Sequence, residues 1–197
     1  MFIYPYFYRK LKRGPQVILP KDIGIIISYS SIDKSSVCVD AGTGSGWLAL
    51  SLARLCRHVY SYDVREDFTA IAEKNKHILG LENITFKKGD VRKRIDEREV
   101  DLVTLDMPDA DKAVSSAKKA LRDNGMIVGY LPNMEQVQGF AKKLKKLGFS
   151  DIHTVEVTVR EMLVREEGMR PSTKGIWHTA YLTFGRKENR KSAEVAQ

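Results

Sequence analysis

Short apolar runs alternate with segments of helical periodicity along most of this chain, and this alternation constrains the fold more than any other feature. The runs are rich in β-branched residues, as in SSVCVD at 35–40, which is typical of buried strands. Strands that alternate with helices predict right-handed crossovers and a mostly parallel sheet covered on both faces, which is an α/β fold. The expected strands are 35–40, 58–63, 84–90, 100–106 and 125–131, and the expected helices are 46–56, 65–80, 109–125 and 133–149.

The end of the chain breaks this rhythm. Residues 152–164 and 178–187 both have an extended pattern with no helix between them, so we expect an antiparallel strand pair at the sheet edge. A chain of 197 residues is most simply one domain. We expect a short N-terminal segment with a leading helix at 1–34, the domain itself at 35–187, and a polar tail at 188–197.

A glycine-rich loop, DAGTGSG at 40–46, follows the first expected strand. A dinucleotide fingerprint would have its third glycine where Trp47 stands, and the loop also lacks the Gly-Lys-Ser/Thr of a P-loop. Its glycines let the backbone approach a ligand, and Asp40 can offset a positive charge. The loop favours a ligand with a cationic or amino-acid head over a pyrophosphate. The loop residues expected at the ligand are Asp40, Gly42, Thr43, Gly44, Ser45 and Gly46.

The next three strands also end at aspartates. Asp63 can accept hydrogen bonds from both hydroxyls of a ribose, Asp90 can reach the amino group of an adenine, and Asp106 ends the fourth strand. Ligands of open α/β sheets bind beyond the carboxyl ends of the strands, so we expect one shared site there. Taken singly, each aspartate would also suit a turn or a helix N-cap. The residues expected at the shared site are Asp63, Val64, Asp90, Val91 and Asp106.

The chain is basic, with a net charge of +8 and clusters of basic residues at 9–13, 87–94, 142–146 and 186–191. Such clusters favour a polyanionic partner, since phosphate neutralisation with release of counterions drives binding. The alternative is a solvated basic surface, as in a protein from a thermophile.

Other compositional features bear on the class of protein. Cys38 and Cys56 have no metal-type spacing, so we expect two small core residues and no metal site. No apolar run reaches the roughly 18 residues that a membrane span needs. The N-terminal sequence MFIYPYFYRKLKRG has its apolar residues before its basic ones, the reverse of a secretory signal. We expect a cytoplasmic protein that does not associate with a membrane.

Several motifs together resemble those of a known enzyme superfamily. VDAGTGSG, YSYD, KKGD and LDMPD are similar, in order and spacing, to the motifs of class I S-adenosylmethionine-dependent methyltransferases. RGPQVILPKDIG at 13–24, YLPNMEQV at 130–137 and REMLVREEGMRPSTKGIWHTAYLTFGRK at 160–187 narrow the resemblance. Over roughly residues 10 to 187 the chain resembles the tRNA (adenine-N1)-methyltransferases of the TrmI type.

This resemblance implies a Rossmann-like fold with a mostly parallel seven-stranded sheet and S-adenosylmethionine as the cofactor. It implies methyl transfer to N1 of a T-loop adenine in tRNA, at position 58 or at both 57 and 58. It also implies Asp106 as the catalytic residue, Gln16 near the cofactor, and Arg170 and His178 near the substrate. Members of the family commonly form homo-oligomers, so a dimer or tetramer is expected.

The chemistry of that reaction suits the residues present. Adenine N1 is a neutral nucleophile that needs no general base, in keeping with a chain that has no evident Cys–His or Ser–His pair. Asp106 would accept a hydrogen bond from the 6-amino group and favour the positive charge that methylation leaves on the ring. The adenine must leave the tRNA stack, and Tyr130 or Trp177 would stack on it. The alternative for both aromatics is an ordinary core or surface position.

The sequence departs from the TrmI type in three places. About a dozen residues precede the resemblance where the family has a β-rich domain, so we expect this chain to lack most of that domain. DMPDADKA at 106–113 lacks a second proline and an aromatic residue, and Trp177 stands where the family has glycine. Two alternatives stay open: a methyltransferase for a small molecule such as a precorrin-like tetrapyrrole, and a non-catalytic tRNA-binding subunit.

Overall fold

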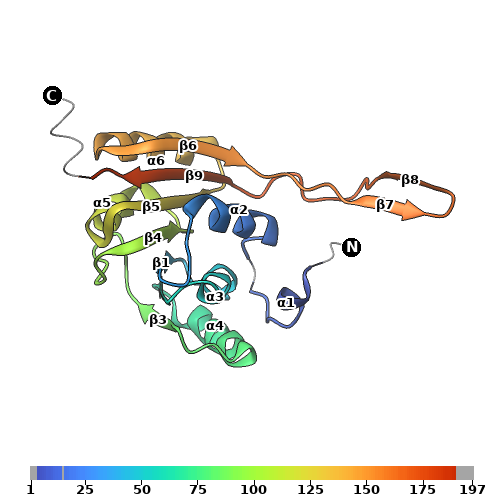
Figure 1. Cartoon of the computed structure of the whole chain (residues 1–197), viewed down its shortest axis with the longest axis horizontal. Helices are drawn as coiled ribbons and strands as arrows, with labels where there is room; N and C mark the ends of the chain where they lie inside the picture. The colour runs from blue at the N-terminus through green and yellow to red at the C-terminus, as the bar shows by residue number, and fades with distance from the viewer. Residues whose placement is uncertain (1–3, 15, 190–197) are drawn as a thin grey trace.

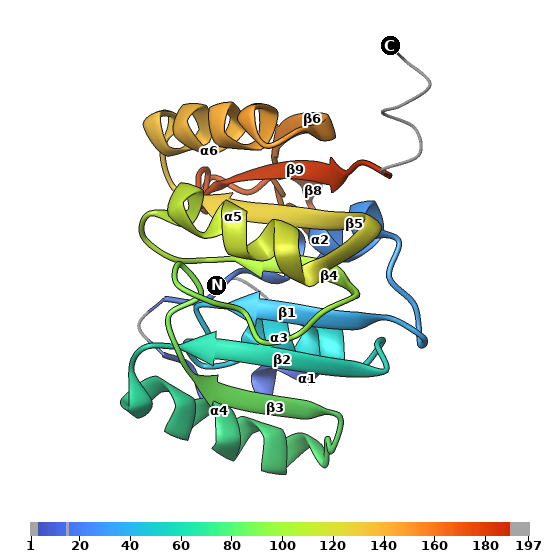
Figure 2. The ribbon, with the colours of Figure 1, turned by 90° about the vertical axis from the view of Figure 1, so that its left-hand side faces the viewer.

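A computed structural model describes residues 4–14 and 16–189 of the chain. The strands of its main sheet are β1 (Val37–Ala41), β2 (His58–Asp63), β3 (Ile84–Lys88), β4 (Val100–Leu105), β5 (Leu121–Leu131), β6 (Phe149–Glu156) and β9 (Tyr181–Lys187). They lie in the order β3-β2-β1-β4-β5-β9-β6 (Figures 1 and 2). Strands β1 to β5 run parallel, and β9 is antiparallel to both β5 and β6. The predicted α/β fold, with its antiparallel strands at one edge, is confirmed.

Helices cover both faces of this sheet. α2 (Pro20–Ser30) and α3 (Trp47–Ala53) pack on one face, and α5 (Ala110–Ala120) and α6 (Met134–Lys146) pack on the other (Figure 2). α4 (Glu66–Leu79) follows β2 and lies against α3. Each face therefore has its own apolar core, as expected for a parallel sheet buried on both sides. α2 is the helix expected ahead of the first strand.

The carboxyl ends of the parallel strands meet at one edge of the sheet. Ala41, the last residue of β1, pairs with Tyr62 of β2 and with Leu105 of β4. Asp63 and Asp106 come directly after these two partners, so they emerge at the same edge. The topology thus brings the strand-end aspartates together, as the order of strands along the chain predicts.

The helix expected at 109–125 is shorter in the structure and ends at Ala120. Leu121 adopts an extended conformation, is fully buried and pairs with Val100, so β5 begins there rather than at residue 125. Burial of this leucine in the sheet core outweighs the helical pattern around it.

The segment expected as one strand at 152–164 is divided in two. β6 ends at Glu156, and β7 (Met162–Arg165) pairs with β8 (Gly168–Pro171) as a separate hairpin that projects from the body (Figure 1). We call residues 157–180, which leave the sheet after β6 and return to it before β9, the arm. Of the polar tail expected at 188–197, positions 190–197 lie outside the described residues.

Hydrogen bonds to Asn75 of α4 hold the N-terminal segment against the rest of the domain, beside the glycine loop. After α1 (Tyr6–Arg9), the backbone amide of Lys12 donates to the side chain of Asn75 at 2.7 Å. The Asn75 amide group donates in turn to the carbonyl oxygens of Lys12 and Ser45, both at 2.8 Å. Asn75 is fully buried, so one α4 side chain ties the N-terminal segment to the glycine loop.

The two cysteines lie in the core, as predicted. Cys38 and Cys56 are buried on the α2 side of the sheet and are not bridged. Within residues 4–14 and 16–189, no group of three or more His, Cys, Asp or Glu side chains is arranged to hold a metal ion. In the same part of the chain, no helix combines the length and the apolar character needed to cross a membrane.

Candidate active site

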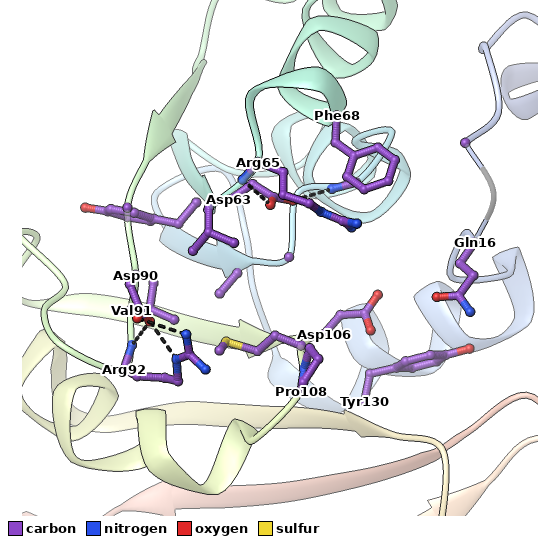
Figure 3. A pocket seen from close by; sticks show the side chains of 18 of the residues that line it. Gln16, Asp63, Arg65, Phe68, Asp90, Val91, Arg92, Asp106, Pro108 and Tyr130 are labelled. Atoms are coloured by element: carbon purple, nitrogen blue, oxygen red, sulfur yellow. Dashed lines mark hydrogen bonds and ion pairs between the residues drawn. The ribbon is translucent and has the colours of Figure 1, made fainter.

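A cavity of about 650 Å³ opens at the carboxyl edge of the parallel strands (Figure 3). The glycine loop, the ends of β2 to β5 and the N-terminal segment all contribute to its walls. Most of the residues predicted from the sequence meet here. The predicted residues that line the cavity are Gln16, Gly42, Gly44, Ser45, Asp63, Val64, Asp90, Val91, Asp106 and Tyr130.

Two glycines shape the loop at the cavity. Gly42 has φ of +92°, and a Cβ there would lie 1.9 Å from the backbone oxygen of Asp106. The Asp106 amide also donates to the carbonyl oxygen of Ala41 at 2.8 Å, so the loop and the end of β4 are in direct backbone contact. Gly46 has φ of +81° and fits closely against Ala72 of α4. These close approaches require glycine, and they hold Asp106 in place at the cavity wall.

The rim carboxylates Asp63 and Asp90 are held by their own neighbours. Asp63 accepts hydrogen bonds from the backbone amides of Gly44 at 3.1 Å and Arg65 at 3.0 Å. Asp90 accepts from the backbone amide of Arg92 at 3.0 Å and from its guanidinium at 2.8 and 3.0 Å. The Arg92 side chain keeps the pKa of Asp90 below its usual value. Both carboxylates are therefore oriented before any ligand arrives.

Three of the predicted loop residues lie behind the cavity wall. The carboxylate of Asp40 is 2% exposed and accepts hydrogen bonds from the hydroxyls of Ser61 at 2.7 Å and Thr104 at 2.8 Å. The Thr43 hydroxyl bonds to Ser61 at 2.7 Å, and Gly46 begins α3. The structure does not bring Asp40, Thr43 or Gly46 to the cavity surface. Burial raises the pKa of Asp40 to about 6, although the two hydroxyls favour its ionised form.

Asp106 stands at the centre of an acidic cluster. Burial, together with the negative charges of Asp40 and Asp63, raises its pKa to about 7. The three carboxyl groups therefore repel one another, and a positive charge in the cavity would relieve that repulsion. The chain as a whole carries a net positive charge, but the negative charges concentrated at this cavity suit a cationic ligand.

The residues predicted near the substrate separate into two groups. Tyr130 lines the cavity near Asp106 (Figure 3), and burial raises its pKa. His178 is exposed and does not line the cavity, but it bonds the Glu156 carboxylate at 2.6 Å and the carbonyl oxygen of Pro132, a lining residue, at 3.0 Å. Both contacts raise the pKa of His178, the Glu156 contact most.

The other two predicted substrate residues lie, like His178, on the arm. Arg170 is an exposed residue of β8, in the projecting hairpin (Figure 1). Trp177 is 52% exposed and stacks with Arg160, whose guanidinium lies 5.5 Å from the ring centroid. The structure brings neither Arg170 nor Trp177 to the cavity.

Some lining residues escaped prediction. The Arg65 guanidinium lies over the Phe68 ring, 3.8 Å from its centroid, on the β2 side of the cavity (Figure 3). Arg92 and Pro108 also line it. All four follow a predicted aspartate by five residues or fewer, so proximity in the chain to Asp63, Asp90 and Asp106 was an available signal. Asn75, which does not line the cavity but bonds Lys12 and Ser45, was not predicted either. The sequence pattern of a helix does not distinguish a buried asparagine from one on the surface.

The site is suited to a ligand that carries both positive charge and hydrogen-bonding groups. The Ser45 hydroxyl is buried in the cavity wall and has no hydrogen-bond partner among the described residues. Buried polar groups without a partner are uncommon, and this one is placed to bond a ligand. The glycine loop, the acidic cluster and this hydroxyl together fit a ligand of the kind of S-adenosylmethionine, which carries a sulfonium charge, an amino-acid head and a nucleoside.

Comparison with known proteins gives concordant results. The family described as "tRNA methyltransferase complex GCD14 subunit" matches residues 7–176. The chain is 41% identical, over an alignment 208 positions long, to the tRNA (adenine(57)-N(1)/adenine(58)-N(1))-methyltransferase TrmI of Methanocaldococcus jannaschii. That alignment covers 90% of this chain and 74% of the relative.

Solved structures share the fold along almost the whole chain. A SAM-dependent O-methyltransferase from Thermotoga maritima matches with a TM-score of 0.89 and 33% identity, over 94% of this chain and 72% of that one. The tRNA (m1A58) methyltransferase TrmI from Aquifex aeolicus matches with a TM-score of 0.87 and 26% identity, over 94% and 77%. By its sequence and its fold, this chain belongs to the GCD14 family of tRNA methyltransferase subunits, in which the TrmI enzymes are its relatives.

Proposed function

We propose that this protein methylates N1 of a T-loop adenine in tRNA, at position 58 or at both 57 and 58, with S-adenosylmethionine as the methyl donor. One observation carries the proposal: an acidic cavity beside a glycine loop, in a chain 41% identical over 90% of its length to an enzyme named for these two adenines. As a tRNA-modifying enzyme, it is proposed to act in the cytoplasm.

The rim of the cavity is proposed to hold the nucleoside part of the cofactor. We assign Asp63 to the ribose hydroxyls and Asp90 to the adenine amino group, with Val64 and Val91 against the ring. Gln16 also lines the cavity and is assigned to the cofactor as well.

The glycine loop is proposed to hold the other end of the cofactor. Gly44 lines the cavity, and a Cβ there would meet nothing nearer than 3.9 Å, so a ligand can approach the backbone at this point. The unpartnered Ser45 hydroxyl provides a hydrogen bond. Asp40 contributes negative charge from beneath the loop. The cofactor supplies a methyl group activated by its sulfonium charge.

Asp106 is proposed as the catalytic residue. Adenine N1 attacks with its own lone pair, so the protein needs to orient the ring rather than to remove a proton first. The Asp106 carboxylate accepts a hydrogen bond from the 6-amino group, and it stabilises the positive charge that passes to the ring as the N1–carbon bond forms and the sulfur–carbon bond breaks. A preorganised group of this kind contributes about 3–4 kcal/mol. Tyr130, beside Asp106, is proposed to contact the acceptor base.

The rest of the surface is proposed to bind the RNA. The net charge of +8 favours binding to a polyanion, because counterions are released when phosphates are neutralised. Such contacts do not distinguish one base from another. Arg170, exposed on the arm, is assigned to RNA contact, and His178 is assigned to support of the acceptor wall through Pro132.

The acceptor can be tested with paired transcripts. An unmodified tRNA transcript is incubated with the protein and methyl-labelled S-adenosylmethionine, beside a transcript with uridine at positions 57 and 58. We expect label in the first transcript and none in the second. Equal labelling of both would contradict the T-loop assignment. Labelling of a precorrin-like tetrapyrrole but of neither transcript would favour a small-molecule methyltransferase.

A homo-oligomer, dimer or tetramer, is also proposed, with the arm as its contact. Val164 pairs with Met169 across the hairpin, and these two side chains and that of Met162 are exposed at 73%, 73% and 56%. A two-stranded hairpin is marginally stable alone, so a second copy of the chain is proposed to cover this apolar face. Light scattering on Val164→Glu should report a smaller particle than on the wild type or on Arg165→Glu. A monomeric wild type would contradict the proposal.

A further inference from the structure

A buried ion pair stands at the start of α2. The side chains of Lys21 and Asp22 are 4% and 0% exposed, and the Lys21 Nζ lies 2.7 Å from the Asp22 carboxylate. Lys21 also donates to the carbonyl oxygen of Val157 at 2.7 Å and to the Thr179 hydroxyl at 2.8 Å. The Thr179 hydroxyl donates to the second Asp22 oxygen at 2.9 Å. The three donors of the ammonium group are thus all used, and the network is satisfied inside the protein.

This network joins both legs of the arm to the body. Val157 lies on the outgoing leg, directly after β6, and Thr179 lies on the returning leg, two residues before β9. Lys21 therefore bonds the two legs at the point where they leave the sheet. A neighbouring residue makes a second connection between the arm and the body. His178 on the returning leg bonds both Glu156 at the end of β6 and the carbonyl oxygen of Pro132.

The same network reaches the wall of the cavity. The half-buried Tyr130 side chain lies beside this network. Burial and the charges of Asp22 and Asp106 raise the pKa of its phenol, and the Thr179 side chain lowers it, so the phenol is near all three groups. Tyr130 and Asp106 line the cavity together (Figure 3). Lys21 thus bonds Thr179, and Thr179 is near Tyr130, on the side of the cavity where the acceptor is proposed to lie.

A stabilising role does not account for this arrangement well. Desolvation of two charges costs about as much as their attraction returns, so apolar side chains of similar volume are often equally stabilising. What a satisfied ionic network does provide is one fixed geometry, because any displacement leaves a charge unpaired. Here the fixed parts are the arm and Tyr130.

We propose that Lys21 is a positioning residue for methyl transfer: through Thr179 and Val157 it holds the arm and Tyr130 in the single arrangement that aligns the acceptor base. The proposal rests on the proposed function. It concerns the acceptor side of the cavity alone, so it predicts that loss of Lys21 leaves cofactor binding intact.

A double-mutant cycle between Lys21 and Tyr130 tests this. We expect Lys21→Met to lower kcat on tRNA by about 10- to 100-fold, as misalignment of reacting groups does. Binding of S-adenosylmethionine, measured by calorimetry, should stay within about twofold of the wild type. In a Tyr130→Phe background, Lys21→Met should lower kcat by less than about threefold, because the two residues act along one path. Additive losses, or a parallel loss of cofactor affinity, would overturn the proposal.

Matched variants separate positioning from general loss of structure. Lys118→Met removes a lysine that bonds the Leu147 carbonyl oxygen, away from the arm and the cavity, and should leave kcat unchanged. Should Lys21→Met fail to fold, Thr179→Val and Thr179→Ser decide the matter. The serine retains the hydroxyl and should keep near wild-type kcat, whereas the valine should lose it. Equal activity of these two variants would overturn the proposal.

Hydrogen exchange gives a readout that does not depend on activity. Lys21→Met should raise amide exchange in both legs of the arm, 157–161 and 172–180, and at Tyr130 and Leu131, while 37–63 stays protected. Unchanged exchange in the legs would overturn the proposal. A wild type that binds the cofactor but methylates no tRNA would overturn the proposed function instead, and the exchange pattern would then decide whether Lys21 holds the arm.

Discussion

Entry of a cation into the cavity is expected to expel protons from its carboxyl groups. Without a ligand, Asp106 has a pKa of about 7 and Asp40 a pKa of about 6. At pH 6, about nine in ten Asp106 side chains are therefore protonated. The difference between the ordinary pKa of 3.8 and about 7 corresponds to about 4 kcal/mol of cost that burial and neighbouring carboxylates place on the ionised form.

The size of the proton release follows from simple electrostatics. A unit positive charge about 4 Å from a carboxylate attracts it by about 1 kcal/mol in water and by about 4 kcal/mol at an effective dielectric constant of about 20. These energies lower the pKa of Asp106 from about 7 to between about 6 and about 4. At pH 6 this group then releases about 0.3 to 0.9 proton when the cation binds. Affinity for S-adenosylmethionine should accordingly rise with pH between about 5.5 and about 7.5.

Isothermal titration calorimetry measures this release directly. At pH 6, in two buffers with different ionisation enthalpies, the observed binding enthalpy of the wild type should differ between the buffers. In Asp106→Asn the difference should fall by about half or more, because Asp40 is then the main carboxyl group left to titrate. An enthalpy that is the same in both buffers, for a wild type that binds the cofactor, would refute the reasoning.

The glycine loop, the acidic cluster, the rim and the N-terminal segment each provide another test. Gly42→Ala places a Cβ on the Asp106 carbonyl oxygen, so it should cost at least about 2 kcal/mol in calorimetric stability and abolish cofactor binding; retained binding would contradict the loop geometry. Native Asp106 keeps a proton that the unfolded chain loses between pH 3.8 and about 7, so the free energy of unfolding should fall by up to about 4 kcal/mol as pH rises through that window. Urea titrations should show a flatter profile for Asp106→Asn, and identical profiles would count against the raised pKa. Asp63→Ala should weaken cofactor binding about 10-fold or more in calorimetry, and unchanged affinity would remove Asp63 from the ribose site. Asn75→Ala leaves backbone groups of Lys12 and Ser45 unbonded, so it should cost about 2–4 kcal/mol and expose the N-terminal segment to protease; unchanged cleavage would argue against the tether.

The sheet and the convergence of its aspartates were predictable from the sequence. Alternating strands and helices leave few topologies, because right-handed crossovers place the carboxyl ends of parallel strands at one edge. Asp63, Asp90 and Asp106 therefore had to meet once the strands were correctly identified. The position of Asp40 beneath the loop was not predictable in this way, because its side chain turns toward the hydroxyls of the neighbouring strands rather than the cavity.

The arm and the Lys21–Asp22 network that holds it depend on contacts between residues far apart in the sequence, which no local sequence pattern reveals. The alternation of apolar residues in β6 continues into β7, so the sequence predicts one strand. In the structure the two are separate strands, because β7 pairs with β8 and not with a strand of the main sheet. Lys21 and Asp22 read as exposed charges at a helix start, whereas both are buried under residues of the arm. The Val157 carbonyl oxygen that Lys21 bonds is 136 positions further along the chain. Such partners become visible only when the chain is folded.

The measurement that tests the central claim most directly is nucleoside mass spectrometry of an unmodified tRNA transcript after incubation with this protein and S-adenosylmethionine. The account predicts 1-methyladenosine in the digest, mapped to the T-loop. It also predicts loss of that product in Asp106→Ala, with cofactor binding retained. Cofactor binding by the wild type without 1-methyladenosine, or methylation of another nucleoside, would contradict it.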